Sequence, residues 1–165
     1  MDNITLIGMP GAGKSTLGVV LAKILGYQFL DSDLLIQKEE KRRLSEIIEK
    51  EGIEGFISIE NRVNASIKAE KTVIATGGSV VYCEDAMKHL KSIGKIVYLK
   101  LSFEAVSKRL GDLKGRGVVL KENQTLKDLY AERVPLYEKY ADLVVDEEGK
   151  NLEESLQAVL DKLER

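Results

Sequence analysis

The 165-residue chain has one cysteine, one histidine and two prolines, and it contains no long apolar run. A single cysteine, Cys83, excludes an intrachain disulfide and a cysteine metal cluster. Without roughly 20 consecutive apolar residues, the sequence offers no segment that could cross a bilayer. The only histidine, His89, falls in an amphipathic helix expected over 84–93, so we expect a surface residue there rather than a ligand or base.

The sequence also lacks an excess of charge of either sign. It has 25 basic and 27 acidic residues and a net charge of −2, so nothing global points to nucleic acid or to an anionic membrane. The N-terminus begins directly with an expected strand and has no signal-peptide pattern. We therefore expect a cytoplasmic protein that binds neither nucleic acid nor a membrane. Its length suits one domain over residues 1–165.

A glycine-rich stretch near the N-terminus is the dominant motif. It fits Gly-x-x-x-x-Gly-Lys-Ser/Thr, the phosphate-binding P-loop, and it lies between an expected strand at 3–7 and an expected helix at 17–25. Backbone amides of such a turn form a nest for phosphate oxygens, to which the helix adds its positive dipole end. A chance glycine-rich turn is the alternative. The predicted ATP-binding residues are Gly11, Ala12, Gly13, Lys14, Ser15 and Thr16.

Two of these residues have predicted roles of their own. Lys14, expected on an exposed loop, would place a positive charge on the β- and γ-phosphates of ATP. The Ser15 hydroxyl is the expected ligand of Mg²⁺, which binds oxygen ligands together with phosphates and water. ATP and Mg²⁺ are therefore the predicted cofactors.

Two acidic residues follow the second expected strand, which spans residues 27–30. Ligands of open α/β sheets gather beyond the carboxyl ends of strands, so Asp31 and Asp33 are candidates for metal and substrate binding. The buried strand expected at 72–75 ends without an acid, which leaves Asp31 to anchor Mg²⁺, through water. The alternative is that Asp31 or Ser32 only caps the helix expected over 34–39.

The remaining strands and helices alternate along the chain. Strands expected near 95–99 and 143–146 complete a three-layer α/β fold, in which a parallel sheet of about five strands is flanked by helices. Gly52 and Gly55 are expected to break a helix, with a new helix beginning near Phe56. Pro135 predicts a kink or break in the helix expected over 125–141.

Two further segments are candidates for contact with substrate. Gly77 and Gly78 follow the strand at 72–75 and bring the backbone close to a ligand, or else form a plain tight turn. The polar stretch 111–123 suits a lid whose Arg116 closes over the transferring phosphate; an exposed loop with an incidental arginine is the alternative.

The order and spacing of these motifs resemble the shikimate kinase family of small P-loop kinases. The similarity runs from Ile4 to the C-terminal helix and includes the P-loop, Asp31-Ser32-Asp33, residues 52–60, Ala75 to Gly78 and Arg133 to Tyr137. It implies transfer of the ATP γ-phosphate to a hydroxyl of shikimate, in aromatic amino-acid synthesis. It also implies a helical substrate-binding segment over about 33–62.

By position, the resemblance implies a role for each of seven residues, in addition to Lys14 of the P-loop. Asp31 would lie near Mg²⁺, and Asp33 would hold the substrate hydroxyls and accept a proton. Lys14, Asp33 and Arg116 would be the catalytic residues. Gly77 and Gly78 would contact the substrate through their backbone. Arg133 would pair with the substrate carboxylate, and Arg109 would lie against adenine.

Three departures from the family pattern fall on the substrate side. Ile57 replaces an arginine of a Phe-Arg-x-x-Glu motif, Ser79 replaces a third glycine, and Gly117 replaces a proline of the lid. Loss of one arginine could remove about 1.5–3 kcal/mol of binding to a carboxylate. Arg62, five residues on, points to a different helix face and is a doubtful substitute.

Three functions remain open on the sequence alone. The first is a monomeric kinase acting on ATP and a small, hydroxylated, anionic substrate, with shikimate as the leading acceptor and a smaller or less anionic one as the alternative. The second is another P-loop kinase, for gluconate or a nucleoside monophosphate. The third is a nucleotide-binding paralogue without kinase activity.

Overall fold

The computed structural model describes residues 2–110 and 123–164. Five parallel strands form one sheet in the order β2-β3-β1-β4-β5, which confirms the predicted class. The strands are β1 (Asn3–Ile7), β2 (Gln28–Asp31), β3 (Thr72–Ala75), β4 (Gly94–Lys100) and β5 (Leu143–Asp146).

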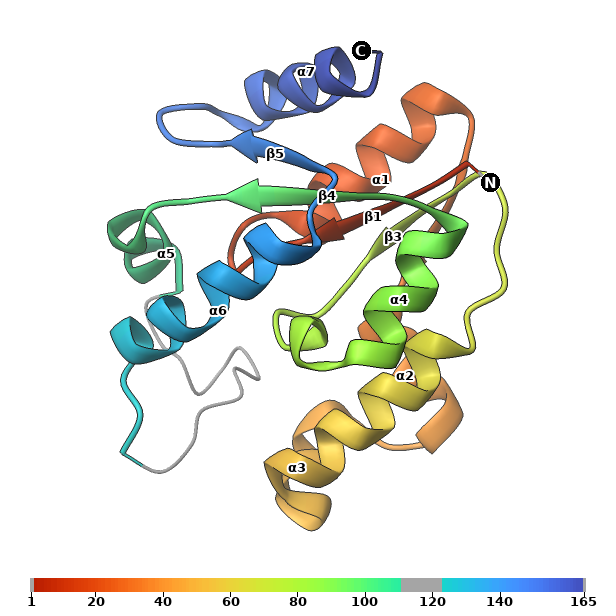
Figure 1. Ribbon diagram of the computed structural model, residues 1–165, viewed down its shortest axis with the longest axis vertical. Helices are drawn as coiled ribbons and strands as arrows, with labels where there is room; N and C mark the ends of the chain where they lie inside the picture. Colours follow the sequence, from red (N-terminus) through yellow and green to blue (C-terminus); the bar gives the residue numbers. More distant parts are fainter. Residues whose placement is uncertain (1, 111–122, 165) are drawn as a thin grey trace.

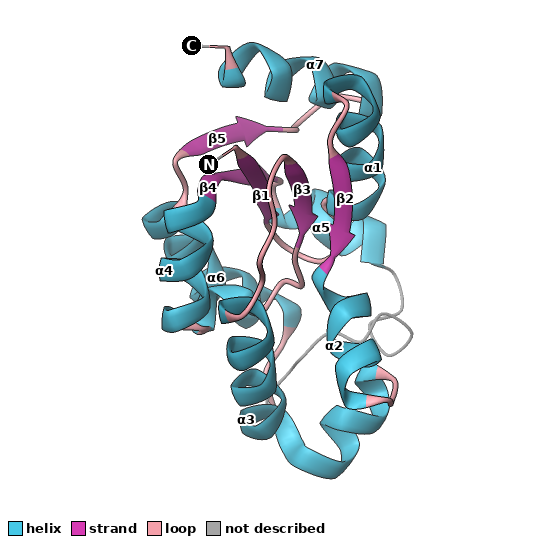
Figure 2. Cartoon of the chain, turned by 90° about the vertical axis from the view of Figure 1, so that its right-hand side faces the viewer, coloured by secondary structure: helices cyan, strands magenta, loops and turns pink. Residues whose placement is uncertain are grey.

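Helices cover both faces of the sheet and extend beyond its carboxyl edge (Figure 1). In Figure 2, α1 lies on one face and α4 and α6 lie on the other, while α2 and α3 project past the strand ends. The helical elements are α1 (Lys14–Leu25), α2 (Ser32–Glu40), α3 (Leu44–Ala65), η1 (Val80–Tyr82), α4 (Glu84–Ile93), α5 (Phe103–Leu110), α6 (Leu126–Tyr140) and α7 (Leu152–Leu163).

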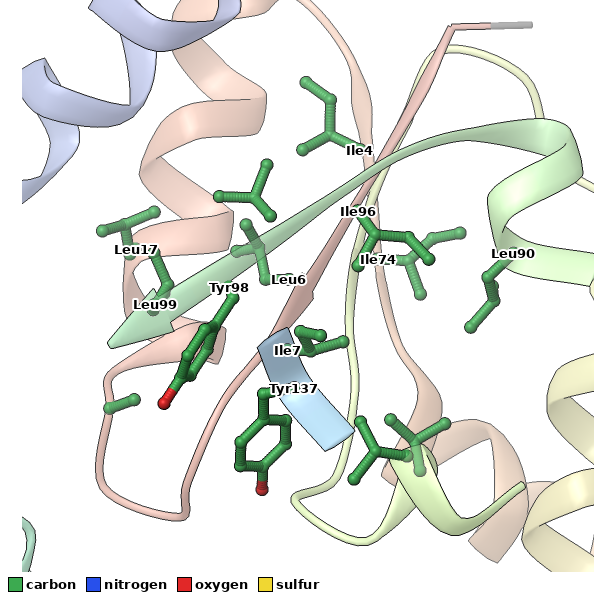
Figure 3. Close-up of a cluster of buried hydrophobic side chains, with 14 of the residues drawn as sticks. Ile4, Leu6, Ile7, Leu17, Ile74, Leu90, Ile96, Tyr98, Leu99 and Tyr137 are labelled. Atoms are coloured by element: carbon green, nitrogen blue, oxygen red, sulfur yellow. The ribbon is translucent and has the colours of Figure 1, made fainter. Parts of the chain in front are cut away.

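The central strands are buried on both faces, which is why they are continuous apolar runs. Every residue of β1 and of β3 is buried. Figure 3 shows how Leu6 and Ile96 from the sheet meet Leu17 of α1 and Leu90 of α4. This core holds the carboxyl ends of β1 and β3 rigidly together, and the loops that follow those strands carry the predicted site.

The segment α2–α3 has a smaller core of its own. Ile36, Ile47, Phe56 and Val63 are buried against one another. The predicted break in this region is only partly right, because α3 continues through Gly55 and bends at Gly52, where φ is 75° and ψ is 177°. Burial of Phe56, which is 3% exposed, favours helix in the second part of α3 despite Gly55.

Packing limits two other local predictions, a break at Pro135 and a surface position of His89. Helix α6 continues through Pro135, whose ring faces solvent, because Arg133 and Tyr137 on the opposite face are both anchored in the interior. His89 is half-buried rather than on the surface, and its Nε2 lies 2.6 Å from the carbonyl oxygen of Ile67. No helix in the described part of the chain is long and apolar enough to span a bilayer.

Gly18 brings α1 unusually close to the sheet. A Cβ at this position would lie 2.8 Å from Cε1 of Phe29 and 3.3 Å from Cδ1 of Leu6. We expect Gly18→Ala to lower the free energy of unfolding by about 1–2 kcal/mol, because overpacking outweighs the better helix propensity of alanine. Urea unfolding measures this change.

The double variant Gly18→Ala/Phe29→Leu provides the control, since a smaller side chain at position 29 should recover part of the lost stability. A Gly18→Ala protein at least as stable as the native one would contradict the proposed close packing.

Candidate active site

The P-loop connects β1 to α1 and takes the shape that its glycines predict. Gly11 and Gly13 have φ angles of 88° and 83°, a left-handed conformation that residues with a Cβ rarely adopt. Gly13 is also the N-cap of α1 and offers no side chain to its first turn. The N-terminus of α1 therefore faces the cavity described below and can accept an anion. Ala12 is 1% exposed and packs its methyl group into the core.

Lys14 is buried, in contrast to the exposed position expected from its place in a loop motif. Its side chain is 8% exposed, and Nζ donates hydrogen bonds to the carbonyl oxygens of Gly8 at 2.7 Å and Met9 at 2.9 Å. Burial lowers the pKa of Lys14 to about 8, although Asp33 nearby acts in the opposite direction. The ammonium group is thus held within the loop, poised for phosphate.

Asp31 combines the two roles that the sequence left as alternatives. Its Oδ1 caps α2 by accepting hydrogen bonds from the backbone N–H groups of Asp33 at 2.9 Å and Leu34 at 3.3 Å. Its Oδ2 accepts a hydrogen bond from Ser15 Oγ at 3.0 Å. One carboxylate oxygen therefore fixes the helix, while the other lies beside the predicted Mg²⁺ ligand.

The hydroxyl–carboxylate pair of Ser15 and Asp31 fits Mg²⁺ chemically, because both groups supply hard oxygen ligands. Within residues 2–110 and 123–164, no group of three or more His, Cys, Asp or Glu side chains is arranged to hold a metal ion. The residues that fit Mg²⁺ here are thus the Ser15 hydroxyl and the Asp31 carboxylate.

Asp33 follows Asp31 by two residues, in the first turn of α2, and lies against the backbone of Gly77. A Cβ at position 77 would lie 2.7 Å from Asp33 Oδ1, so any larger residue there would displace this carboxylate. Burial raises the pKa of Asp33 to about 6, and the neighbouring charge of Asp31 acts in the same direction. A carboxylate with this pKa is deprotonated near neutral pH and can still accept a proton.

Arg133 reaches the same region from α6. It is 1% exposed, and a Cβ on Gly78 would lie 2.7 Å from its Nη1, so the second glycine is also required by close approach. One turn further along α6, the Tyr137 hydroxyl donates a hydrogen bond to the Gly78 carbonyl oxygen at 2.6 Å. Tyr137 also stacks on Tyr98 of β4, with ring centroids 5.1 Å apart (Figure 3). Tyr137, which packs on the sheet, thus holds the Gly77–Gly78 turn in place.

A single cavity of about 340 Å³ joins the phosphate loop to these groups. Its walls combine anion-binding backbone, two cations and one carboxylate, a combination suited to bringing a polyphosphate against a hydroxyl. Among the residues predicted to act on phosphate or acceptor, those lining this cavity are Gly11, Gly13, Lys14, Ser15, Thr16, Asp33, Gly77, Gly78 and Arg133.

Two predicted residues, Arg109 and Arg116, are not among the described residues that line the cavity. Arg109 lies beside the P-loop, where its Nη1 donates a hydrogen bond to the Gly11 carbonyl oxygen at 3.0 Å. Arg116 and nearly all of the predicted lid lie outside the described residues. Neither the adenine contact of Arg109 nor the closure of Arg116 is tested by this geometry.

Glu60 is a buried residue for which the sequence predicted no role. Its side chain is fully buried, and Oε1 accepts a hydrogen bond from Ser79 Oγ at 2.7 Å. Burial raises its pKa to about 7. Ser79, one of the departures from the family pattern, thus binds an acid in the wall behind Gly77. The signal available in the sequence was an acid among the apolar positions of α3.

A second substrate-side departure, Ile57, removes a charge, and the third, Gly117, lies outside the described residues. Ile57 is half-buried and packs against both hydrophobic clusters. Arg62 does not replace the missing guanidinium, because its Nη2 pairs with Glu40 at 2.7 Å and its side chain is 57% exposed. Arg133 is the only arginine among the described residues that line the cavity.

Comparisons with known proteins match nearly the whole chain to a single protein family. A family model described as "Shikimate kinase" matches residues 10–164. The shikimate kinase of Thermodesulfovibrio yellowstonii is 40% identical over 168 aligned residues, which cover 100% of this chain and 96% of the relative.

Solved structures agree with this match. A shikimate kinase from Acinetobacter baumannii in complex with shikimate superposes with a TM-score of 0.87 at 36% identity, covering 99% of this chain and 93% of that one. Shikimate kinase from Aquifex aeolicus superposes with a TM-score of 0.82 at 34% identity, covering 98% of this chain and 96% of the other.

Proposed function

Because the chain belongs to the shikimate kinase family, we propose that it transfers the γ-phosphoryl group of ATP to a hydroxyl group of shikimate. The observation that carries this proposal is the common cavity in which the phosphate loop faces Asp33, the Gly77–Gly78 backbone and Arg133. Anion-binding groups on one wall and groups for a hydroxylated carboxylate on the other suit a kinase for a small acid.

The positions of the charged groups assign each of them a role in phosphoryl transfer. The acceptor oxygen attacks the γ-phosphorus as the bond to the β–γ bridging oxygen breaks, so that ADP leaves and Asp33 takes the hydroxyl proton. Lys14 neutralises charge that develops on the phosphoryl oxygens. Ser15 would bind Mg²⁺ directly and Asp31 through water, and the ion would supply further neutralisation of the phosphates.

Several finer points belong to the same proposal. Arg109 would lie against the adenine ring, and Arg116 would close over the transferring group. The enzyme would act as a cytoplasmic monomer, with neither nucleic acid nor a membrane as partner. Size-exclusion chromatography with light scattering tests the monomer directly.

A coupled assay for ADP release, with ATP, Mg²⁺ and shikimate, tests the proposed activity. We expect turnover that depends on all three, and a shikimate phosphate product identified by ³¹P NMR. Intact ATP binding without turnover of shikimate would exclude this acceptor and leave the kinase class standing.

One observation favours an alternative acceptor within the same class. Ile57 and the engaged Arg62 leave Arg133 as the one arginine of the described cavity wall, which suits a smaller or less anionic alcohol. A thermal-shift panel of acceptors separates these cases, because a ligand that binds the native state raises the melting temperature. No phosphorylation of any acceptor would instead favour a nucleotide-binding paralogue.

Replacing Arg133 tests the carboxylate clamp. We expect Arg133→Lys and Arg133→Ala to raise the KM for the acceptor by roughly 10- to 100-fold while the KM for ATP stays unchanged, because a hydrogen bond to a charged group is lost. Steady-state kinetics with each substrate varied in turn measures both constants.

Arg62→Ala is the matched control, since this arginine is exposed and pairs with Glu40 outside the cavity. An acceptor KM that is unchanged in the Arg133 variants would remove the clamp from the proposal.

A further inference from the structure

The hydroxyl of Tyr82 bridges two oppositely charged side chains at the back of the acceptor wall. It accepts a hydrogen bond from Arg133 Nε at 3.4 Å and donates one to Glu132 Oε1 at 2.6 Å. The Cζ atom of Arg133 also lies 5.4 Å from the centroid of the Tyr82 ring. One tyrosine thus contacts the guanidinium through both its hydroxyl and its π face.

The bridge connects parts of the chain that are distant in sequence. Tyr82 ends η1, directly after the Gly77–Gly78 turn, whereas Glu132 and Arg133 lie in α6. Adjacent residues on a helix point about 100° apart, so Glu132 and Arg133 project in different directions and Tyr82 joins them across the gap. Gln124 Nε2 donates a further hydrogen bond to Glu132 Oε2 at 3.1 Å, which helps to fix the acid.

The guanidinium that Tyr82 contacts belongs to a residue that lines the cavity. Tyr82 contacts the inner nitrogen, Nε, while Nη1 lies against Gly78 at the cavity wall. Arginine has a long side chain with many rotamers, so holding it in one orientation before binding lowers the entropy lost when a ligand arrives. With one arginine in the described cavity wall, the orientation of that group decides how a carboxylate is received.

We propose that Tyr82 is a positioning residue: its hydroxyl, backed by Glu132, holds Arg133 in the orientation that receives the carboxylate of the acceptor. This inference rests on the proposed function, since it concerns the same acceptor site. It adds a specificity determinant that lies outside the P-loop, the acidic pair and the glycine turn.

Tyr82→Phe is the decisive variant, because it keeps the ring and removes only the hydroxyl. We expect the KM for shikimate to rise about 5- to 20-fold, the loss typical of a partly buried hydrogen bond to charged groups. The KM for ATP and the melting temperature should stay as in the native protein. The matched control is Tyr130→Phe, whose hydroxyl donates to the Leu101 carbonyl oxygen at 2.6 Å, outside the cavity lining.

A shikimate analogue with hydroxymethyl in place of the carboxylate separates positioning from a general structural effect. Native protein and Tyr82→Phe should use this analogue equally well, because it has no carboxylate for Arg133. An equal loss with both acceptors, or no loss with either, would overturn the inference.

The arginine Nε–H signals in ¹H–¹⁵N NMR spectra provide a readout that does not depend on the acceptor. The Arg133 signal, assigned by its absence in Arg133→Lys, should shift or broaden in Tyr82→Phe and stay unchanged in Tyr130→Phe. Should the native protein fail to phosphorylate shikimate, the proposed function falls, and this signal alone decides whether Tyr82 holds Arg133. Identical Arg133 signals in the native protein and Tyr82→Phe would overturn the inference.

Discussion

Replacing Lys14 with methionine is expected to lower kcat/KM for ATP by about 10²- to 10³-fold, the loss typical of removing one preorganised donor to a developing charge. Methionine keeps most of the length of the side chain and removes its charge. Lys14 is the one lysine among the described residues that line the cavity, and the one arginine there, Arg133, is assigned to the acceptor. Steady-state kinetics with ATP varied at saturating acceptor measures the effect.

The fold should survive this change. The buried ammonium group donates to two loop carbonyls, but its burial disfavours the charged form, and these two contributions largely offset each other. We therefore expect the melting temperature of Lys14→Met to change little. Lys23→Met, in an exposed position of the same helix, is the matched control and should keep full activity.

The pH dependence gives a second signature of Lys14. Its pKa of about 8 means that the amine of the free enzyme loses its charge above that pH, earlier than an ordinary lysine. The native kcat/KM for ATP should fall above pH 8, and this alkaline limb should be missing in Lys14→Met. Native-like activity of the variant at pH 7, where Lys14 of the native protein is charged, would contradict the assigned role.

Asp33→Asn is the second change with a large expected effect. We expect kcat to fall by about 10²-fold, near the lower end of the range for general bases, because a loose phosphoryl transfer needs little proton removal early in the reaction. Asparagine keeps the shape beside Gly77 and cannot accept the proton. ADP release at saturating substrates measures kcat, and the KM for ATP should stay unchanged.

The acidic limb of the pH profile belongs to the same residue. With a pKa of about 6, Asp33 is protonated below that pH, so native kcat/KM for the acceptor should rise with pH through 6 and then level off. Asp33→Asn should lack this limb. Asp85→Asn, where the native carboxylate accepts a hydrogen bond from Asn61 at 3.2 Å outside the cavity, is the control and should leave the profile unchanged.

Stability should change in the opposite direction to activity. The pKa of Asp33 is raised on folding, so the folded state binds the proton more tightly than the unfolded chain does, and stability falls as pH rises from about 4 to about 6. Above pH 6 the native protein carries the cost of a buried, ionised Asp33, and the neutral asparagine variant does not. A higher melting temperature of Asp33→Asn at pH 7.5, with lower kcat, is therefore expected. Lower stability together with native kcat would contradict both roles.

The parts of the site that were predictable follow from short stretches of sequence. The P-loop is a local pattern in which glycine positions, a lysine and a hydroxyl have defined spacing, and the carboxylates of Asp31 and Asp33 follow a recognisable strand. Arg133 and Arg109 were predicted only through resemblance to a family. The structure brings all of these to one edge of the sheet except Arg116, which lies outside the described residues.

Contacts between distant residues could not be predicted in the same way. Glu60 meets Ser79 across 19 positions, and Tyr82 meets Glu132 across 50, with no pattern in either segment that names the partner. Predictions at Gly55 and Pro135 failed for a related reason. Local propensity favours a break there, but burial of Phe56 and of Arg133 and Tyr137 on the interior face keeps the chain helical at Gly55 and Pro135, while the predicted break is found at Gly52.

The sequence by itself determined the class of the fold, the position of the phosphate site and the acids beside it, because hydrophobic period and turn chemistry act over a few neighbouring residues. Only the tertiary structure decided which side chains share the acceptor wall, how deeply Lys14 is buried, and that Tyr82 lies between Glu132 and Arg133. These properties depend on how the helices pack on the sheet, and packing depends on the whole chain at once.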